Sequence, residues 1–222
     1  MEHIKVALGK LGQGKAIPSQ GIITVEIELT KAELEEQLRK SLLVSSLDNT
    51  FKNFERVPGT EEAYTAFRNL ALGHTNWKML LCYGGTGNGK THLCESAAIE
   101  LHSRGRFTRV MTMARIMGIL KDTFNRGEGL SLEQIISKYQ RAERLIIDDV
   151  GMGGSGSAWE YGQLEEIINH RSHENLFTIL TTNRDLTELP ERVVSRFQDP
   201  DIGRVVLNSG KDYRRIKEVI NE

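Results

Sequence analysis

The sequence predicts an α/β fold in which a five-stranded parallel sheet is flanked by helices. From residue 77 onward, short apolar runs of strand length alternate with longer segments of helical periodicity. A glycine-rich loop joins the first apolar run to the helix that follows it. Two later apolar runs end in polar residues, which places side chains able to do chemistry at one edge of a sheet. Strands that alternate with helices favour parallel pairing, because each crossover helix returns the chain to the same edge.

The first 44 residues are expected to form an N-terminal arm, followed by the main domain over 45–222. Residues 21–29 alternate apolar and polar side chains and predict a short strand. Thr30 and Glu33 have the spacing of a capping box, which predicts a helix reaching residue 44 with Leu34, Leu38 and Leu42 on one stripe. That stripe either docks on a partner or packs back on its own domain.

The main domain is expected to begin with a helix over 60–72, which Gly73 ends as a C-terminal cap. The predicted strands are 77–83, 107–113, 145–149, 177–182 and 204–207. The predicted helices that accompany them are 91–104, 114–124, 131–141, 158–173, 190–197 and 212–220.

Composition favours a cytoplasmic globular protein with no membrane association. Hydrophobic residues make up 39% and charged residues 27% of the 222 residues, and the net charge is −1. This charge gives no overall attraction to nucleic acid, so any such binding requires a local basic patch. The chain shows no apolar run of membrane-spanning length and no signal-peptide core. Its two cysteines, Cys82 and Cys94, are expected to be buried and reduced.

The glycine-rich loop matches a phosphate-binding pattern of Gly, four residues, Gly-Lys-Thr. Its glycines allow consecutive N–H groups to face one concave nest at the start of a helix, which suits a triphosphate. Lys90 is placed to reach the β- and γ-phosphates, and the Thr91 hydroxyl is placed to bind Mg²⁺. The expected ATP-binding residues are Gly84, Gly85, Thr86, Gly87, Asn88, Gly89, Lys90, Thr91 and His92.

Two carboxylates, Asp148 and Asp149, end the apolar run Leu-Ile-Ile. Asp148 is suited to hold Mg²⁺ together with Thr91, and Asp149 to polarise the attacking water as a general base. Without the glycine-rich loop, a solvated turn would explain the pair equally well.

Further polar residues follow at positions that suit a catalytic role. Asn183 ends the next apolar run and is suited to orient water, although an Asx-type turn is equally compatible with it. Arg192 and Arg196 lie four residues apart on one predicted helix, which suits either surface ion pairs or contact with a neighbouring subunit's nucleotide. Arg214 is placed to reach phosphates in its own subunit.

The motifs GGTGNGKTHL, LIIDDVG, TILTTN, ERVVSRFQD and GKDYRR occur in this order along residues 45–220. Together they resemble the AAA+ ATPases of the bacterial helicase-loader group, the DnaC and IstB-like proteins, which are related to the initiator DnaA. The resemblance implies a P-loop NTPase fold of AAA+ type without a C-terminal helical lid. It assigns Lys90 and Thr91 to Walker A, Asp148 and Asp149 to Walker B, and Asn183 to sensor 1. It likewise implies Arg196 as arginine finger with Arg192 beside it, and Arg214 as sensor 2.

The function implied is ATP-dependent loading or remodelling of a hexameric replicative DNA helicase on single-stranded DNA, with Mg²⁺-dependent ATP hydrolysis. The resemblance also implies self-association through the ATP site, and the arm over 1–44 is a hypothesis for the helicase contact. Arg115, Lys121 and Arg126, within a basic stretch, are candidates for DNA phosphate contact, as against a solvated helix face. The alternatives are an IstB-like transposition helper, a P-loop small-molecule kinase, and a nucleotide-dependent adaptor that does not hydrolyse ATP.

Overall fold

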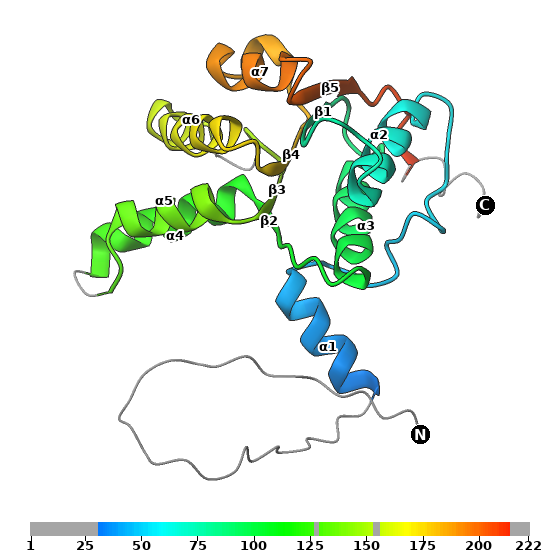
Figure 1. Cartoon of the computed structure of the whole chain (residues 1–222), viewed down its shortest axis with the longest axis horizontal. Coiled ribbons are helices and arrows are strands. Elements are labelled where there is room, and N and C mark those ends of the chain that lie inside the picture. The colour runs from blue at the N-terminus through cyan, green and yellow to red at the C-terminus, as the bar shows by residue number, and fades with distance from the viewer. Residues whose placement is uncertain (1–30, 127–128, 153–155, 214–222) are drawn as a thin grey trace.

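The centre of the molecule is a sheet of five parallel strands in the order β2-β3-β4-β1-β5. The computed structural model describes residues 31–126, 129–152 and 156–213 of the chain (Figure 1). The strands are β1 (Met79–Tyr83), β2 (Val110–Thr112), β3 (Arg144–Asp148), β4 (Phe177–Thr182) and β5 (Gly203–Leu207). This confirms the predicted fold class. Because β1, β4 and β3 are neighbours, the loop after β1 and the polar ends of β3 and β4 share one edge of the sheet.

Helices cover both faces of the sheet, with α2 and α3 on one side and α4 to α7 on the other (Figure 1). Within β1, Leu80 and Cys82 pack toward the first pair, whereas Met79 and Leu81 pack toward the second group. All four of these side chains are fully buried, which is why the strand reads as a continuous apolar run. The helices are α2 (Glu61–Leu72), α3 (Lys90–Ser103), α4 (Met113–Arg126), α5 (Leu132–Arg141), α6 (Ala158–His173) and α7 (Glu191–Gln198).

The N-terminal helix α1 (Lys31–Leu42) packs back on the main domain at its C-terminal end. Leu42 and Val44 are buried in the same cluster as α2 and α3, and the partly buried Leu38 packs against this cluster. The C-terminal end of the apolar stripe of α1 therefore packs against the main domain of the same chain. The assignment of 1–44 to a separate arm stays a prediction.

Strand β2 is shorter than the sequence predicts. A strand was expected over 107–113, but Phe107 is 46% exposed and only Val110–Thr112 pair with β3. Met113 already belongs to α4, where its buried side chain packs in the core. Strand β2 lies at the edge of the sheet and pairs only with β3. The residues before Val110 can therefore be apolar without being paired, and their alternation does not show where the strand begins. The strand predicted over 21–29, the Thr30 cap and most of the helix predicted over 212–220 lie outside the described residues.

A fully buried arginine, Arg171 of α6, fastens α5 to the sheet. Burial of the guanidinium lowers the pKa of Arg171 to about 10, so the group stays charged at neutral pH. It is satisfied without a carboxylate, because its N–H groups donate to oxygens at the end of α5, in the turn after it and at the start of β4. These acceptors are Tyr139 O (2.8 Å), Gln140 O (3.3 Å), Ala142 O (2.6 Å), Phe177 O (2.6 Å) and Thr178 Oγ1 (2.9 Å).

In the described part of the chain, no helix has the length and apolar content needed to cross a bilayer. The cytoplasmic location stays a prediction. Both cysteines are free and buried, as expected, and burial raises the pKa of the Cys82 thiol to about 12. After β5, the described residues through 213 form no helical lid.

Candidate functional site

The glycine-rich loop runs from the end of β1 into the first turn of α3, and its shape depends on its glycines. Gly84, Gly87 and Gly89 have φ angles of 141°, 77° and 88°, a region in which side chains are strained. There is also no room for a side chain at any of the three, since a Cβ on Gly87 would meet the Asp212 carboxylate. A Cβ on Gly84 would lie 2.1 Å from the Asn208 carbonyl oxygen, and one on Gly89 would lie 2.7 Å from the Phe54 ring. The loop is thus closely packed on its outer side.

The lysine of the loop, Lys90, is held inside it. Its Nζ donates to the carbonyl oxygens of Gly84 (2.9 Å) and Gly85 (2.6 Å) and to Asn88 Oδ1 (2.9 Å). The residue is 5% exposed, and this burial lowers the pKa of the ammonium, while the charges of Asp148 and Asp149 act in the opposite direction. Both carboxylates therefore lie within electrostatic reach of Lys90.

Asp148 joins the start of α3 to the ends of β3 and β4. Thr91 Oγ1 donates to its Oδ2 at 2.7 Å, and Thr181 Oγ1 donates to its Oδ1. The carboxylate is 2% exposed. The sequence predicted that Thr91 and Asp148 lie together, and the structure places them in direct contact. Thr181 completes the arrangement.

Asp149 follows β3 in a left-handed backbone conformation, with φ of 57°. Such a conformation is uncommon for a residue with a side chain and is found preferentially at functional sites. Its N–H donates to Thr181 Oγ1 at 3.2 Å, so the same threonine supports both acids. The chain turns sharply at Asp149 and leaves the sheet there.

Asn183 follows β4, beside the residues after Asp149. Thr182 Oγ1, one residue earlier, donates to Val150 O at 2.8 Å, which holds the ends of β3 and β4 together. Within the described residues, the Asn183 Oδ1 atom is buried and has no hydrogen-bond partner. Buried polar atoms are rarely left unpaired, so this oxygen is suited to accept a hydrogen bond from a ligand or a water molecule.

His92, which the sequence placed among the nucleotide-binding residues, faces the segment before α2. Its Nε2 lies 3.0 Å from Thr50 O, and its ring packs edge-on against Phe54 with centroids 5.2 Å apart. The buried Glu95 of α3 accepts hydrogen bonds from Ser45 and Asn49 on the same segment. This face of α3 therefore holds the aromatic segment beside the loop rather than facing a phosphate.

Helix α7, which carries both predicted arginines, lies on the α6 side of the sheet, opposite the face that α3 covers (Figure 1). Arg196 Nε donates to Asn169 Oδ1 of α6 at 3.0 Å. The Arg192 side chain is 81% exposed and makes a loose ion pair with Glu165 at 3.9 Å. The structure does not bring them to the loop of their own chain. Arg214 lies outside the described residues.

The comparison with known families decides what this domain is. The family described as the bacterial DnaA ATPase domain matches residues 46–202. The chain belongs to this family.

Known relatives of this DnaA-family domain include helicase loaders. The replicative helicase loader DnaC of Escherichia coli K12 is 32% identical over 142 residues, which are 59% of this chain and 57% of DnaC. The chain thus matches little more than half the length of that relative. The sequence-based assignment to the DnaC-like AAA+ proteins is confirmed.

Solved structures agree with this assignment. Domain III of the replication initiator DnaA from Thermotoga maritima has a TM-score of 0.62 and 29% identity, covering 79% of this chain and 73% of that one. A replication initiator DnaA bound to AMPPCP and single-stranded DNA has a TM-score of 0.64 and 23% identity, covering 79% of this chain and 55% of that one. The second likeness shows the fold alone.

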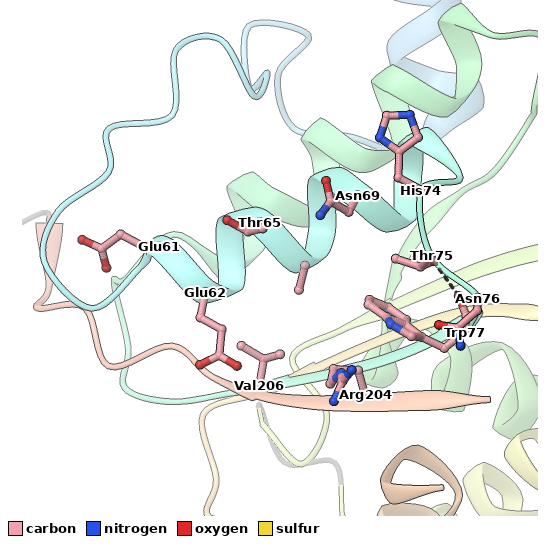
Figure 2. A pocket seen from close by; sticks show the side chains of 11 residues that line it. Glu61, Glu62, Thr65, Asn69, His74, Thr75, Asn76, Trp77, Arg204 and Val206 are labelled. Atoms are coloured by element: carbon pink, nitrogen blue, oxygen red, sulfur yellow. Dashed lines mark hydrogen bonds between the residues drawn. The ribbon is translucent and has the colours of Figure 1, made fainter. Parts of the chain in front are cut away.

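The DnaA-family domain also has an open groove of about 610 Å³ between α2 and β5, away from the loop. Figure 2 shows Glu62 of α2 and Arg204 of β5 on its two sides, with Trp77 at one end. None of the residues predicted to bind nucleotide lines it. The groove is therefore separate from the candidate site.

Two residues of the site were missed by sequence reasoning. Thr181 is a polar residue in an apolar strand, which was a usable signal. The sequence gives no signal for Asn208, just after β5, because its role depends on a contact with Asn88, which is distant in sequence. Asn88 Nδ2 donates to Asn208 O at 2.7 Å and Asn208 Nδ2 donates to Asn88 O at 3.0 Å, with both residues buried. The pair braces the loop, and Tyr213 N–H adds a bond to Gly87 O at 3.0 Å.

Replacing the brace should destabilise the DnaA-family domain. We expect Asn208→Ala to lower the free energy of unfolding by about 1–3 kcal/mol, because the buried Asn88 carbonyl oxygen loses its donor, Asn208 Nδ2, and the Gly210 N–H loses its acceptor, Asn208 Oδ1. Urea unfolding measures this change. Asn76→Ala, at an exposed asparagine in the groove, is the control and should change it by less than about 0.5 kcal/mol. Equal effects of the two substitutions would contradict the brace.

Proposed function

We propose that this chain is an ATPase that loads or remodels a replicative DNA helicase on single-stranded DNA, with hydrolysis that depends on Mg²⁺. The observation that carries the ATPase part is the 2.7 Å contact between Thr91 and Asp148, directly beside the buried Lys90. This contact unites the loop after β1 with the acidic end of β3. The DNA part is supported by the relatives, which are named as a helicase loader and as replication initiators.

ATP binds with its phosphates in the glycine-rich loop. The N–H groups of the loop and of the first turn of α3 receive the phosphate oxygens, and the helix dipole adds positive potential. Lys90 leaves the carbonyl oxygens of Gly84 and Gly85 and donates to the β- and γ-phosphates instead. Phe54, packed against Gly89 and His92, lies at the border of this site and is suited to contact the adenine.

The Thr91 hydroxyl and, through water, Asp148 would hold Mg²⁺. Oxygen ligands of this kind suit Mg²⁺, which supplies charge neutralisation along the triphosphate when it is bound. The described residues hold no group of three His, Cys, Asp or Glu side chains able to bind a metal alone. Phosphate oxygens of the nucleotide would supply further ligands to the ion.

Hydrolysis proceeds by attack of water on the γ-phosphorus. Asp149 takes a proton from the water, and the Asn183 amide oxygen orients that water by accepting its second hydrogen. The bond between the γ-phosphorus and the bridging oxygen breaks, which releases ADP and phosphate. Two adjacent acids followed by an amide favour water as the acceptor over a small-molecule hydroxyl.

The roles of Lys90 and Asp149 are separable by mutation. We expect Lys90→Ala to abolish ATP binding, because it removes the phosphate contact. Asp149→Asn should retain ATP binding and lower the hydrolysis rate by about 10²- to 10⁴-fold, because the general base is lost. Binding is measured with a fluorescent ATP analogue and hydrolysis by phosphate release.

Asp201→Asn, in the exposed turn before β5, is the matched control and should hydrolyse ATP normally. Undiminished turnover in Asp149→Asn would remove Asp149 from the mechanism. Absence of ATP binding in the unaltered chain would reject the proposed function as a whole.

Subunits are proposed to assemble side by side through the ATP site. Arg196, and Arg192 beside it, then approach the γ-phosphate of the neighbouring subunit, where such a group stabilises the charge of the transition state. Their position on α7, away from the loop of their own chain, supports a role in a second subunit. Arg214 is proposed to contact phosphate in its own subunit.

Mixing two inactive variants tests the shared site. We expect Arg196→Ala to lower the ATPase rate by up to about 10³-fold while ATP binding is kept. Mixing it with Lys90→Ala should restore part of the rate, because one interface then has both an intact loop and an intact arginine.

Asn169→Ala removes the hydrogen-bond partner of Arg196 but keeps the arginine, so it controls for a purely structural effect. No recovery on mixing, or equal losses in Arg196→Ala and Asn169→Ala, would contradict the shared site.

The helicase contact is proposed to lie in the N-terminal arm. Because Leu42 and Val44 belong to the core, the informative deletion removes residues 1–30 and leaves α1 in place. Tagged Asp149→Asn protein with ATP should retain the replicative helicase from a bacterial extract, as identified by mass spectrometry. The shortened chain should lose the helicase and keep ATP binding. Recovery of a transposase would instead favour the IstB-like alternative, and helicase binding by the shortened chain would rule out residues 1–30 as the contact.

A further inference from the structure

The first two turns of α3 hold the stretch of chain that lies between α1 and α2. We call residues 45–54 the base-side segment, because Phe54 at its end borders the proposed adenine position. His92, Glu95 and Ser96 are three or four residues apart and therefore share one face of α3. His92 Nε2 and Ser96 Oγ lie 3.0 and 3.2 Å from main-chain oxygens of the segment. The helix that begins at the phosphate loop thus also carries the base-side segment.

Glu95 makes the shortest contacts with the base-side segment. Its carboxylate accepts hydrogen bonds from the Ser45 N–H and from Asn49 Nδ2, both at 2.5 Å, and from Ser45 Oγ at 3.2 Å. The residue is 2% exposed, and it takes no part in the ion pairs of the described part of the chain. A buried carboxylate without a cation is costly unless its oxygens accept hydrogen bonds. The three donors of the segment therefore stabilise Glu95, and Glu95 in turn fixes the segment.

A turn connects the part of the segment that Glu95 holds to Phe54. Asn53 Oδ1 accepts hydrogen bonds from the Thr50 N–H at 2.9 Å and from the Thr50 hydroxyl at 3.0 Å, and Asn53 Nδ2 donates to Asp48 O. Phe54 follows this turn directly, with its ring against the phosphate loop. A shift of the segment at Glu95 would therefore also move the Phe54 ring.

We propose that Glu95 is a positioning residue for the nucleotide base. By holding Ser45 and Asn49 it fixes the base-side segment, so that the Phe54 ring is already in place when ATP enters. A binding group that is ordered beforehand loses less entropy on binding, which raises the affinity. The proposal rests on the proposed function, since it specifies what orders the base side of the ATP site. Glu95 then acts on binding of the base and not on binding of the phosphates.

An exchange of donor and acceptor between positions 95 and 49 isolates this contact. Glu95→Gln replaces one carboxylate oxygen by an amide NH₂, which then faces a donor of the segment. Asn49→Asp places a second carboxylate against Glu95. In the double variant, the new amide donates to the new carboxylate, so a donor again faces an acceptor while the net charge is unchanged.

Isothermal titration calorimetry on the full-length chain, with AMPPCP and with inorganic triphosphate in the presence of Mg²⁺, tests the proposal. Glu95→Gln and Asn49→Asp should each weaken AMPPCP binding roughly tenfold, because a buried hydrogen bond is lost. The double variant should recover most of the affinity. Inorganic triphosphate has no base, so its affinity should be unchanged in all three variants.

Turnover separates positioning from catalysis. Glu95→Gln should raise the KM for ATP roughly tenfold and leave kcat unchanged, because the lost interaction is made equally in the ground state and in the transition state. Phe54→Ala should weaken AMPPCP binding as well, and adding Glu95→Gln to it should change little more, because Glu95 acts through that ring. Glu100→Gln, at an acid of the same helix that pairs with Arg104, is the matched control and should bind AMPPCP normally.

Equal losses of AMPPCP and inorganic triphosphate binding would overturn the proposal, because Glu95 would then only stabilise α3 and the loop. No recovery in the double variant, or the same loss in Glu100→Gln, would overturn it as well. Each of these results rejects the role of Glu95 alone and leaves the proposed ATPase standing. Binding of neither ligand by the unaltered chain would instead reject the proposed ATPase, and this proposal with it.

Discussion

The candidate site depends on one chain of hydrogen bonds, in which Thr91 and Thr181 both donate to the carboxylate of Asp148. Through it, the first turn of α3 and the ends of β3 and β4 are held as one unit. A buried carboxylate is costly unless it is paired, and here two hydroxyl donors and the nearby Lys90 provide that pairing. The parallel sheet explains why these residues meet, because neighbouring strands end at the same edge. Everything proposed for nucleotide chemistry starts from this fixed geometry.

The sequence was sufficient to predict those parts of the structure that follow from local rules. The loop motif and the paired acids predicted that Thr91 and Asp148 face one site, because a phosphate loop after one strand and acids after another have few alternative arrangements; their direct hydrogen bond was not predicted. Helix α6 and strand β4 were predicted at their observed bounds, and the structure explains the start of α6 by a capping box between Ser157 and Glu160. The fold class followed from the alternation of such segments.

Features that depend on distant contacts were not predictable in the same way. The reciprocal bonds between Asn88 and Asn208 join positions 120 residues apart, and neither residue type signals the pairing. His92 belongs to the loop motif by sequence, yet the geometry turns it toward Thr50 and Phe54. The start of β2 was misplaced because Phe107 has the composition of a strand residue but lies before the first paired position. In each case packing between separate segments decided the outcome.

The resting position of Lys90 has a consequence for the energetics of ligand recognition. Its side chain is already ordered and largely dehydrated by three hydrogen bonds within the loop. The Lys90 side chain therefore loses its rotamer freedom and its hydration when the chain folds, not when phosphate binds. On phosphate binding, the ammonium group only exchanges carbonyl oxygens for phosphate oxygens as its hydrogen-bond acceptors. Affinity then depends on how much better a charged phosphate oxygen is than a carbonyl oxygen. Ligands with no such charge at that position gain nothing from this lysine, which makes the loop selective for polyanions rather than merely receptive to them.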